Sequence, residues 1–139
     1  MRQLVIIFIL FVSPELLAED NNKQFLMDFI AGSYHLIGKA LDSENTYYGT
    51  ITFKKTGNNL AVIRTIANTV AYGDAAIEKA LHGETNVLRI RFRETSIDYE
   101  ETCLITGDLD NYARLSCYLY RPGEKTDDPG LETFFIKHE

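Results

Sequence analysis

Apolar and polar residues alternate along most of the chain from residue 33 onward, in short segments separated by turn-forming residues. Alternation with a period of two is typical of β-strands that bury one face. The connections contain Gly, Asn, Asp and Pro, which favour tight reversals of the chain. The pattern predicts strands at residues 33–41, 47–55, 59–66, 71–79, 86–93, 97–106, 112–120 and 131–137.

Short connections between these segments indicate antiparallel hairpins that follow one another in series. An open sheet of this kind would leave two unpaired edges, and closing the sheet removes both. The sequence therefore predicts an all-β protein, an eight-stranded antiparallel up-and-down barrel with a short N-terminal helix. Residues 75–81 are ambiguous because their composition favours a helix, so a strand there requires that pairing in the barrel overrides this propensity.

The helix is predicted directly before the first strand. Four apolar residues between positions 25 and 30 recur at helical spacing. Asn21 or Asn22 is the expected N-cap, because an asparagine side chain can accept a hydrogen bond from the first free backbone N–H groups. The helix is expected to end near Gly32.

The beginning of the chain has the pattern of an export signal. An unbroken apolar run over residues 4–12 follows a basic residue and precedes the helix breaker Pro14 and the small residue Ala18. We expect a signal peptide at residues 1–18, cleaved after Ala18, and a single domain over residues 19–139. An uncleaved membrane anchor is the alternative. The later segments are not apolar enough to span a bilayer.

The formal net charge of −6 disfavours nucleic acid as a partner, because an acidic chain lacks the basic surface that neutralises phosphates. The local exception is the series Arg89, Arg91 and Arg93, which share one face of a predicted strand. We interpret this series as part of a solvated outer barrel face. An anion-binding site is the alternative.

The two cysteines, Cys103 and Cys117, lie at equal sequence distances from Asp110 in a turn-rich stretch. In a hairpin centred on Asp110 they lie directly opposite each other, which suits a cross-strand disulfide. A metal or redox pair would favour a C-x-x-C spacing or neighbouring histidines, which this part of the sequence lacks. A disulfide predicts an oxidising compartment, so we expect a periplasmic or secreted protein.

The predicted inward faces are mostly apolar, but Tyr47, Arg64, Tyr99 and Glu101 interrupt them. A charge inside a barrel must be paired or hydrogen-bonded, since burying it alone costs several kcal/mol. In one interpretation Arg64 and Glu101 neutralise each other in a filled core. In the other, Arg64 and a tyrosine hold the carboxylate or other polar head of an amphipathic ligand.

In this second interpretation the apolar tail of the ligand lies along Ile51, Phe53, Ile90 and Phe92. The candidate ligand-binding residues are therefore Tyr47, Arg64, Tyr99, Glu101, Phe53 and Phe92. The longest connection, residues 121–130, shares one barrel end with the turns at Asp42, Asn68 and Glu94 in a meander. We expect this acidic end to be the mouth of the barrel.

Catalysis is not indicated by the sequence. His35, His82 and His138 fall on an outer strand face, a turn and the C-terminal tail, so they share no site. The sequence contains no G-x-S-x-G, H-E-x-x-H or paired-carboxylate motif. We therefore expect a non-catalytic protein without a metal or cofactor.

Gly32, Ser33 and Tyr34 open the first predicted strand, and with the N-terminal helix and eight strands this arrangement resembles the lipocalin (calycin) class of small barrels. Many lipocalins have Gly-x-Trp here, where the ring plugs the closed end, and Tyr34 takes the place of that Trp. The absence of any Trp from the chain argues against an avidin-like biotin site.

The resemblance implies a function in binding. Calycins mostly bind small apolar molecules, so the expected function is sequestration of a small amphipathic or apolar ligand, such as a lipid or fatty acid, inside the barrel. One branch of similar size with one disulfide inhibits bacterial metalloproteases. The alternative function is therefore a protein-binding inhibitor of a secreted or periplasmic hydrolase that acts through its mouth loops.

Overall fold

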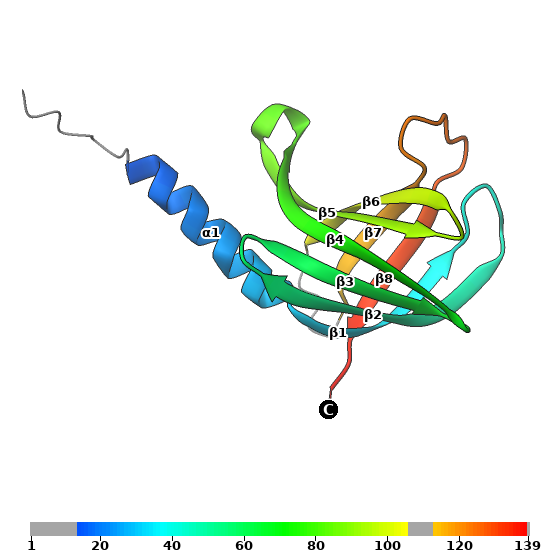
Figure 1. Cartoon of the computed structure of the whole chain (residues 1–139). Coiled ribbons are helices and arrows are strands. Elements are labelled where there is room, and N and C mark those ends of the chain that lie inside the picture. Colours follow the sequence, from blue (N-terminus) through cyan, green and yellow to red (C-terminus); the bar gives the residue numbers. More distant parts are fainter. Residues whose placement is uncertain (1–13, 106–112, 139) are drawn as a thin grey trace, which may run out of the picture.

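Eight antiparallel strands pair in chain order and close into a barrel, because β8 also pairs with β1 (Figure 1). The computed structural model describes residues 14–105 and 113–138. The strands are β1 (Gly32–Lys39), β2 (Thr46–Thr56), β3 (Asn59–Ile66), β4 (Thr69–Ala80), β5 (Thr85–Glu94), β6 (Ile97–Ile105), β7 (Ala113–Tyr120) and β8 (Gly130–Ile136). The predicted eight-stranded up-and-down barrel is confirmed.

The ambiguous segment after residue 75 is a strand. Ala75 pairs with Ile90 and Ile77 with Leu88 across β4 and β5. Ala75 also pairs with Leu60 on the other side, so its backbone belongs to ladders on both flanks. Ladder pairing and the burial of alternate side chains override the helical propensity of this segment. A short 3₁₀ turn, η1 (Leu81–Gly83), then leads into β5.

The predicted disulfide is confirmed. Cys103 and Cys117 pair directly across β6 and β7, their Cα atoms are 4.0 Å apart, and their sulfurs are bonded. Both side chains are buried in the barrel. The Asp110 turn on which this prediction was centred lies outside the described residues, as does residue 106 of the predicted sixth strand.

The helix is longer than predicted. α1 spans Pro14–Ile30, so Asn21 and Asn22 lie within the helix and the prediction of an N-cap there is wrong. Residues 15–19 are strong helix formers and extend the helix toward Pro14, a residue that is well tolerated at the start of a helix. The predicted cleavage point after Ala18 falls inside α1, and the apolar run 4–12 lies outside the described residues. The export signal stays a prediction.

The C-terminal end of α1 packs against the barrel. Met27 and Ile30 are buried, and the Tyr34 hydroxyl donates a 2.6 Å hydrogen bond to the backbone oxygen of Ile30. Arg114 of β7 donates to the Phe29 backbone oxygen at 2.8 Å, and its guanidinium lies 4.5 Å from the centre of the Phe29 ring. The C-terminal end of α1 therefore lies against one end of the barrel (Figure 1).

The barrel interior next to α1 is filled. Tyr34 packs edge-on against Phe53 with ring centres 5.8 Å apart, and Phe53 lies 6.1 Å from Phe134. Leu36 and Ile51 are also fully buried beside these rings. Tyr34 thus lies at the position that the resemblance assigned to it, and the described side chains in this half of the barrel are packed together.

The outer face of β4, β5 and β6 is charged and internally neutralised. The three arginines of β5, at positions 89, 91 and 93, form ion pairs with Glu78, Glu100 and Asp98. These pairs support the interpretation of a solvated outer face and leave no free cationic stripe there. Among the described residues, no helix has both the length and the apolar character needed to cross a membrane.

Candidate ligand site at the barrel mouth

A pocket of about 260 Å³ opens at the barrel end opposite α1. Its walls come from the β1–β2 connection and from the mouth-side ends of β2, β3, β5, β6 and β7. The lining residues are Ala40, Leu41, Tyr47, Arg64, Ile66, Phe92, Glu94, Tyr99, Leu119 and Arg121. This is the end that carries the long 121–129 connection, so the predicted mouth coincides with the pocket.

The rim of the pocket is held together by polar contacts between two connections. The Asp42 N–H donates to the backbone oxygen of Asp128 at 2.9 Å, and the Asp128 N–H donates to the Asp42 carboxylate at 3.1 Å. Lys39 of β1 also reaches the Asp128 carboxylate at 2.6 Å. The β7–β8 connection is therefore anchored to the β1–β2 connection although it extends beyond the strand ends (Figure 1).

Four of the six predicted ligand-binding residues line this pocket: Tyr47, Arg64, Phe92 and Tyr99. Glu101 lies below them and is fully buried. Phe53 lies in the filled half of the barrel, where it contacts Tyr34 and Phe134. Alternation places Phe53 on the correct face of β2, but at the end of the strand next to α1 rather than at the mouth.

Arg64 forms the floor of the pocket and is paired with two carboxylates. Its Nη2 donates to Glu132 of β8 at 2.5 Å, and its Nη1 donates to Glu94 of β5 at 3.0 Å. In the filled-core interpretation Arg64 paired with Glu101, but the ion pairs of Arg64 go to Glu132 and Glu94, and Glu101 acts on it only through its charge. The reason is geometric, because β8 and β5 present carboxylates to the guanidinium across the barrel interior.

Tyr47 supports the same arrangement. Its hydroxyl donates a 2.5 Å hydrogen bond to the Glu132 oxygen that Arg64 also contacts. Burial raises the pKa of Tyr47, and the Glu132 carboxylate beside it raises the pKa further. The ring fills the space beside Gly38, where a Cβ atom would lie only 2.5 Å from it. Glycine at position 38 therefore provides space for the Tyr47 ring.

Glu101 and Glu132 are two carboxyl groups in one buried site. Burial raises the pKa of Glu101 well above its usual value, the neighbouring Glu132 carboxylate raises it further, and the positive charge of Arg64 offsets part of the shift. One oxygen of each carboxyl and the Nε of Arg64 have no hydrogen-bond partner among the described residues. Two adjacent buried carboxyls beside one arginine favour a protonated Glu101.

Replacing Glu101 by glutamine is expected to flatten the pH dependence of stability. Because the folded protein holds the Glu101 proton to higher pH than the unfolded chain, this contribution to stability is full below pH 4.5 and is lost as pH rises through the folded pKa. Urea unfolding from pH 4 to 9 measures the slope. The outward-facing Glu100→Gln variant should keep the wild-type slope, and equal slopes in wild type and Glu101→Gln would contradict the prediction.

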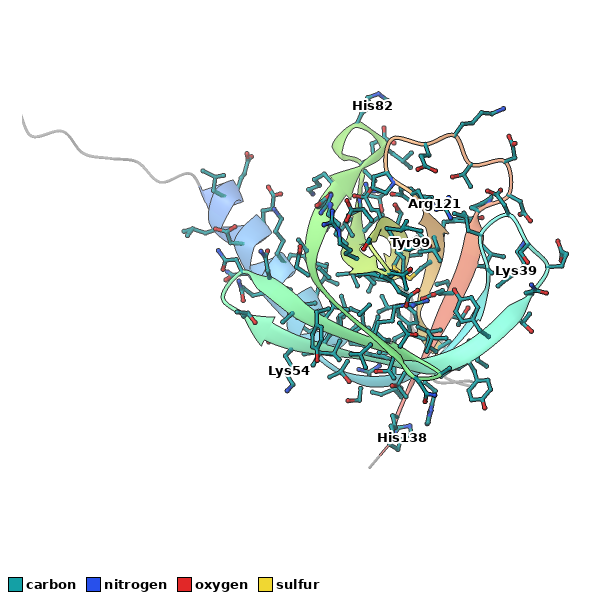
Figure 2. All side chains as sticks on the ribbon, turned by 45° about the vertical axis from the view of Figure 1, so that its right-hand side comes forward. Lys39, Lys54, His82, Tyr99, Arg121 and His138 are labelled. Atoms are coloured by element: carbon teal, nitrogen blue, oxygen red, sulfur yellow. A yellow bond between two sulfur atoms is a disulfide. The ribbon has the colours of Figure 1, made fainter. Side chains whose placement is uncertain are left out.

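One wall of the pocket consists of two aromatic rings bracketed by arginines. Phe92 and Tyr99 stack with ring centres 5.4 Å apart and an interplanar angle of 19°. The Arg64 guanidinium lies 4.8 Å from the Phe92 ring centre, and the Arg121 guanidinium 5.9 Å from that of Tyr99. Figure 2 shows Tyr99 and Arg121 beside each other at the open end. The Tyr99 hydroxyl raises the pKa of Arg121, and the Glu124 carboxylate, 3.5 Å from the guanidinium, raises the pKa further.

Sequence reasoning missed three residues of this site: Glu132, Glu94 and Arg121. Glu132 could have been found, because it alternates with Phe134 on β8 and so points inward. Glu94 could have been found in the same way, because it alternates with Phe92 on β5, whereas Arg121 follows β7, where alternation gives no direction. The histidines are not part of the site: His82 and His138 lie far apart (Figure 2), and His35 is exposed on the outer face.

Comparison with models of known protein families gives no match, and comparison with curated proteins finds no similar sequence.

Proposed function

We propose that this protein is a non-catalytic binding protein that reversibly sequesters a small amphipathic or apolar molecule in the mouth of its barrel. The observation that carries the proposal is the 260 Å³ pocket, in which a stacked aromatic wall faces polar groups on the floor. Its volume lies just below the range of about 300–1,000 Å³ typical of small-molecule sites. The likeness of the barrel to lipocalins supports the same class of function.

The ligand has to be small. The predicted path for an apolar tail ran along Ile51, Phe53 and Ile90, but these side chains are at most 1% exposed and pack in the filled core. An apolar body can instead contact Ile66, Phe92 and Leu119 near the mouth. A ring or a short chain fits this space, whereas a long fatty acid tail would require the core to open.

The polar groups of the pocket support binding rather than chemistry. Arg64 and Tyr47 are held by the buried Glu132, so they present a fixed polar floor to a ligand rather than an exposed nucleophile or base. The buried disulfide supports the expected periplasmic or secreted location, since such bonds persist in oxidising compartments.

The proposal is tested by native mass spectrometry of protein purified from an oxidising compartment without organic solvent. We expect a reproducible adduct on the wild-type protein and a five- to tenfold weaker affinity in Tyr99→Ala, since a lost ring contact costs about 1 kcal/mol or more. Tyr118→Ala removes the same side chain from the outer face and should retain the adduct. An adduct that is equally strong in both variants would overturn the proposed site.

A second candidate function is protein inhibition through the mouth loops, and one observation favours it. The 121–129 connection projects from the barrel yet is anchored through Asp128, so it could enter another protein's cleft without much loss of conformational freedom. The exposed positions of Lys125 and Asp127 on this loop leave it accessible. Binding of a secreted hydrolase that survives Tyr99→Ala but is lost when the loop is shortened would support this function over the first.

A further inference from the structure

The two halves of the Arg64 guanidinium lie in different surroundings. Nη2 donates to Glu132, which is 1% exposed and also accepts the Tyr47 hydroxyl, so this half belongs to the buried network. Nη1 faces the pocket and donates to Glu94. The Glu94 side chain is 24% exposed, whereas the Glu132 side chain is fully buried. Solvent and ligand can therefore reach the Glu94 pair but not the Glu132 pair.

Glu94 is placed where it can leave Arg64. It is the last residue of β5 and is followed by the Thr95–Ser96 turn, whose residues both have positive φ. Among the described residues, the Glu94 side chain interacts with Arg64 through this ion pair. Water can solvate the partly exposed Glu94 carboxylate when it turns out, whereas the Arg64 side chain is only 4% exposed and needs another acceptor in its place. Rotation of the Glu94 side chain toward the mouth would free the Nη1 side of Arg64 for such an acceptor.

Charge balance favours an anion in the place that Glu94 leaves. Glu94 is the acidic residue among those that line the pocket, and Arg64 and Arg121 are the basic ones. With Glu94 turned out, Glu132 still holds Nη2 of Arg64 and Glu124 lies 3.5 Å from the Arg121 guanidinium, but Nη1 of Arg64 has lost its acceptor. A single ligand carboxylate replaces the charge that Glu94 withdrew, and it can accept the hydrogen bond that Nη1 gave to Glu94.

We propose that the mouth pocket takes a small monocarboxylate with a flat ring or short aliphatic body, and that Glu94 is a built-in competitor that occupies the carboxylate position on Arg64 until the ligand displaces it. The ligand body lies against the Phe92 and Tyr99 rings, and Arg121 contributes the second positive charge. This inference rests on the proposed function, because it names the ligand class of the same pocket.

The test compares benzoate, benzyl alcohol and benzylamine as probes of equal shape and different charge. Affinities are measured by ¹H–¹⁵N NMR titration at pH 7 for wild type, Glu94→Gln and Glu44→Gln. Glu94→Gln should bind benzoate roughly fivefold or more tightly than wild type, since no internal carboxylate competes, and should bind benzyl alcohol unchanged. Glu44→Gln removes an equal charge from the exposed rim without freeing Arg64, and should change benzoate affinity less than twofold.

Arg121→Gln provides a second variant that does not touch the buried network. It should weaken benzoate binding several-fold and leave benzyl alcohol unaffected. The inference is overturned if Glu94→Gln leaves benzoate affinity unchanged, or if wild type prefers benzylamine, which the acidic rim would attract. Binding of benzyl alcohol without benzoate would overturn the ligand class and leave the proposed function standing. Failure of all three probes together with a clean apo mass in native mass spectrometry would overturn both.

Discussion

Arg64→Met is expected to lower the free energy of unfolding at pH 7 by about 3–5 kcal/mol, the largest effect of any single substitution that we propose. Methionine keeps much of the side-chain volume, so the loss of stability reports the removal of the charge rather than the creation of a cavity. Without the guanidinium, Glu132 stays buried with no counter-ion and lies beside the equally buried Glu101. Urea unfolding followed by circular dichroism measures the change.

Two comparisons isolate the cause of this loss. Arg91→Met removes an arginine that is 44% exposed and paired with Glu78 and Glu100 on the outer face, and it should cost at most about 1 kcal/mol. Adding Glu132→Gln to the Arg64→Met variant removes the stranded carboxylate and should recover much of the lost stability. The explanation fails if Arg64→Met costs no more than Arg91→Met, or if Glu132→Gln recovers nothing in that background.

The fold was predictable because alternation marks most of the strands locally, and only residues 75–81 within β4 were ambiguous. Alternation identifies the buried face of a strand without reference to its neighbours, and short connections then determine which strands pair. The Cys103–Cys117 bridge followed from hairpin symmetry alone. The helix boundary was missed for a local reason: Asn21 and Asn22 are favoured as caps, but strong helix formers on their N-terminal side carry the helix past them.

The site was predictable only in part, since alternation shows that a residue points inward but not what it meets. Arg64 and Glu132 lie 68 residues apart and pair across the barrel interior, a contact that no short-range pattern encodes. Alternation also does not show how far along the barrel axis a residue lies. Phe53 and Tyr47 share a face of β2, yet Phe53 packs beside Tyr34 in the filled half while Tyr47 reaches the mouth pocket.

The filled half of the barrel and the polar floor have complementary roles. In the proposed function the ligand binds above Arg64, because Phe53, Tyr34 and Phe134 pack together further inside the barrel. The network of Glu132, Arg64 and Tyr47 then holds the floor in one arrangement, because each group fixes the next. A preorganised floor of this kind reduces the entropic cost of binding a small molecule, which partly compensates for its limited contact area.

Removing the disulfide by Cys103→Ala together with Cys117→Ala is expected to lower the free energy of unfolding by about 3 kcal/mol. The bridge closes a loop with a sequence separation of 14 and restricts the unfolded chain. The barrel should still form, because β6 and β7 each pair with a second neighbour, β5 and β8. Urea unfolding of wild type with and without reductant, compared with the double variant, measures the effect.

The disulfide and the buried carboxyl site should not contribute independently to the free energy of unfolding. The Cys103 sulfur lies 3.9 Å from a Glu101 oxygen, so losing the bridge loosens the packing that desolvates this carboxyl. We therefore expect the double cysteine variant and Arg64→Met to combine with less than the sum of their separate losses. Ligand affinity should change little, because neither cysteine lines the mouth pocket. Unchanged wild-type stability in reductant would contradict the first expectation, and strict additivity would contradict the coupling.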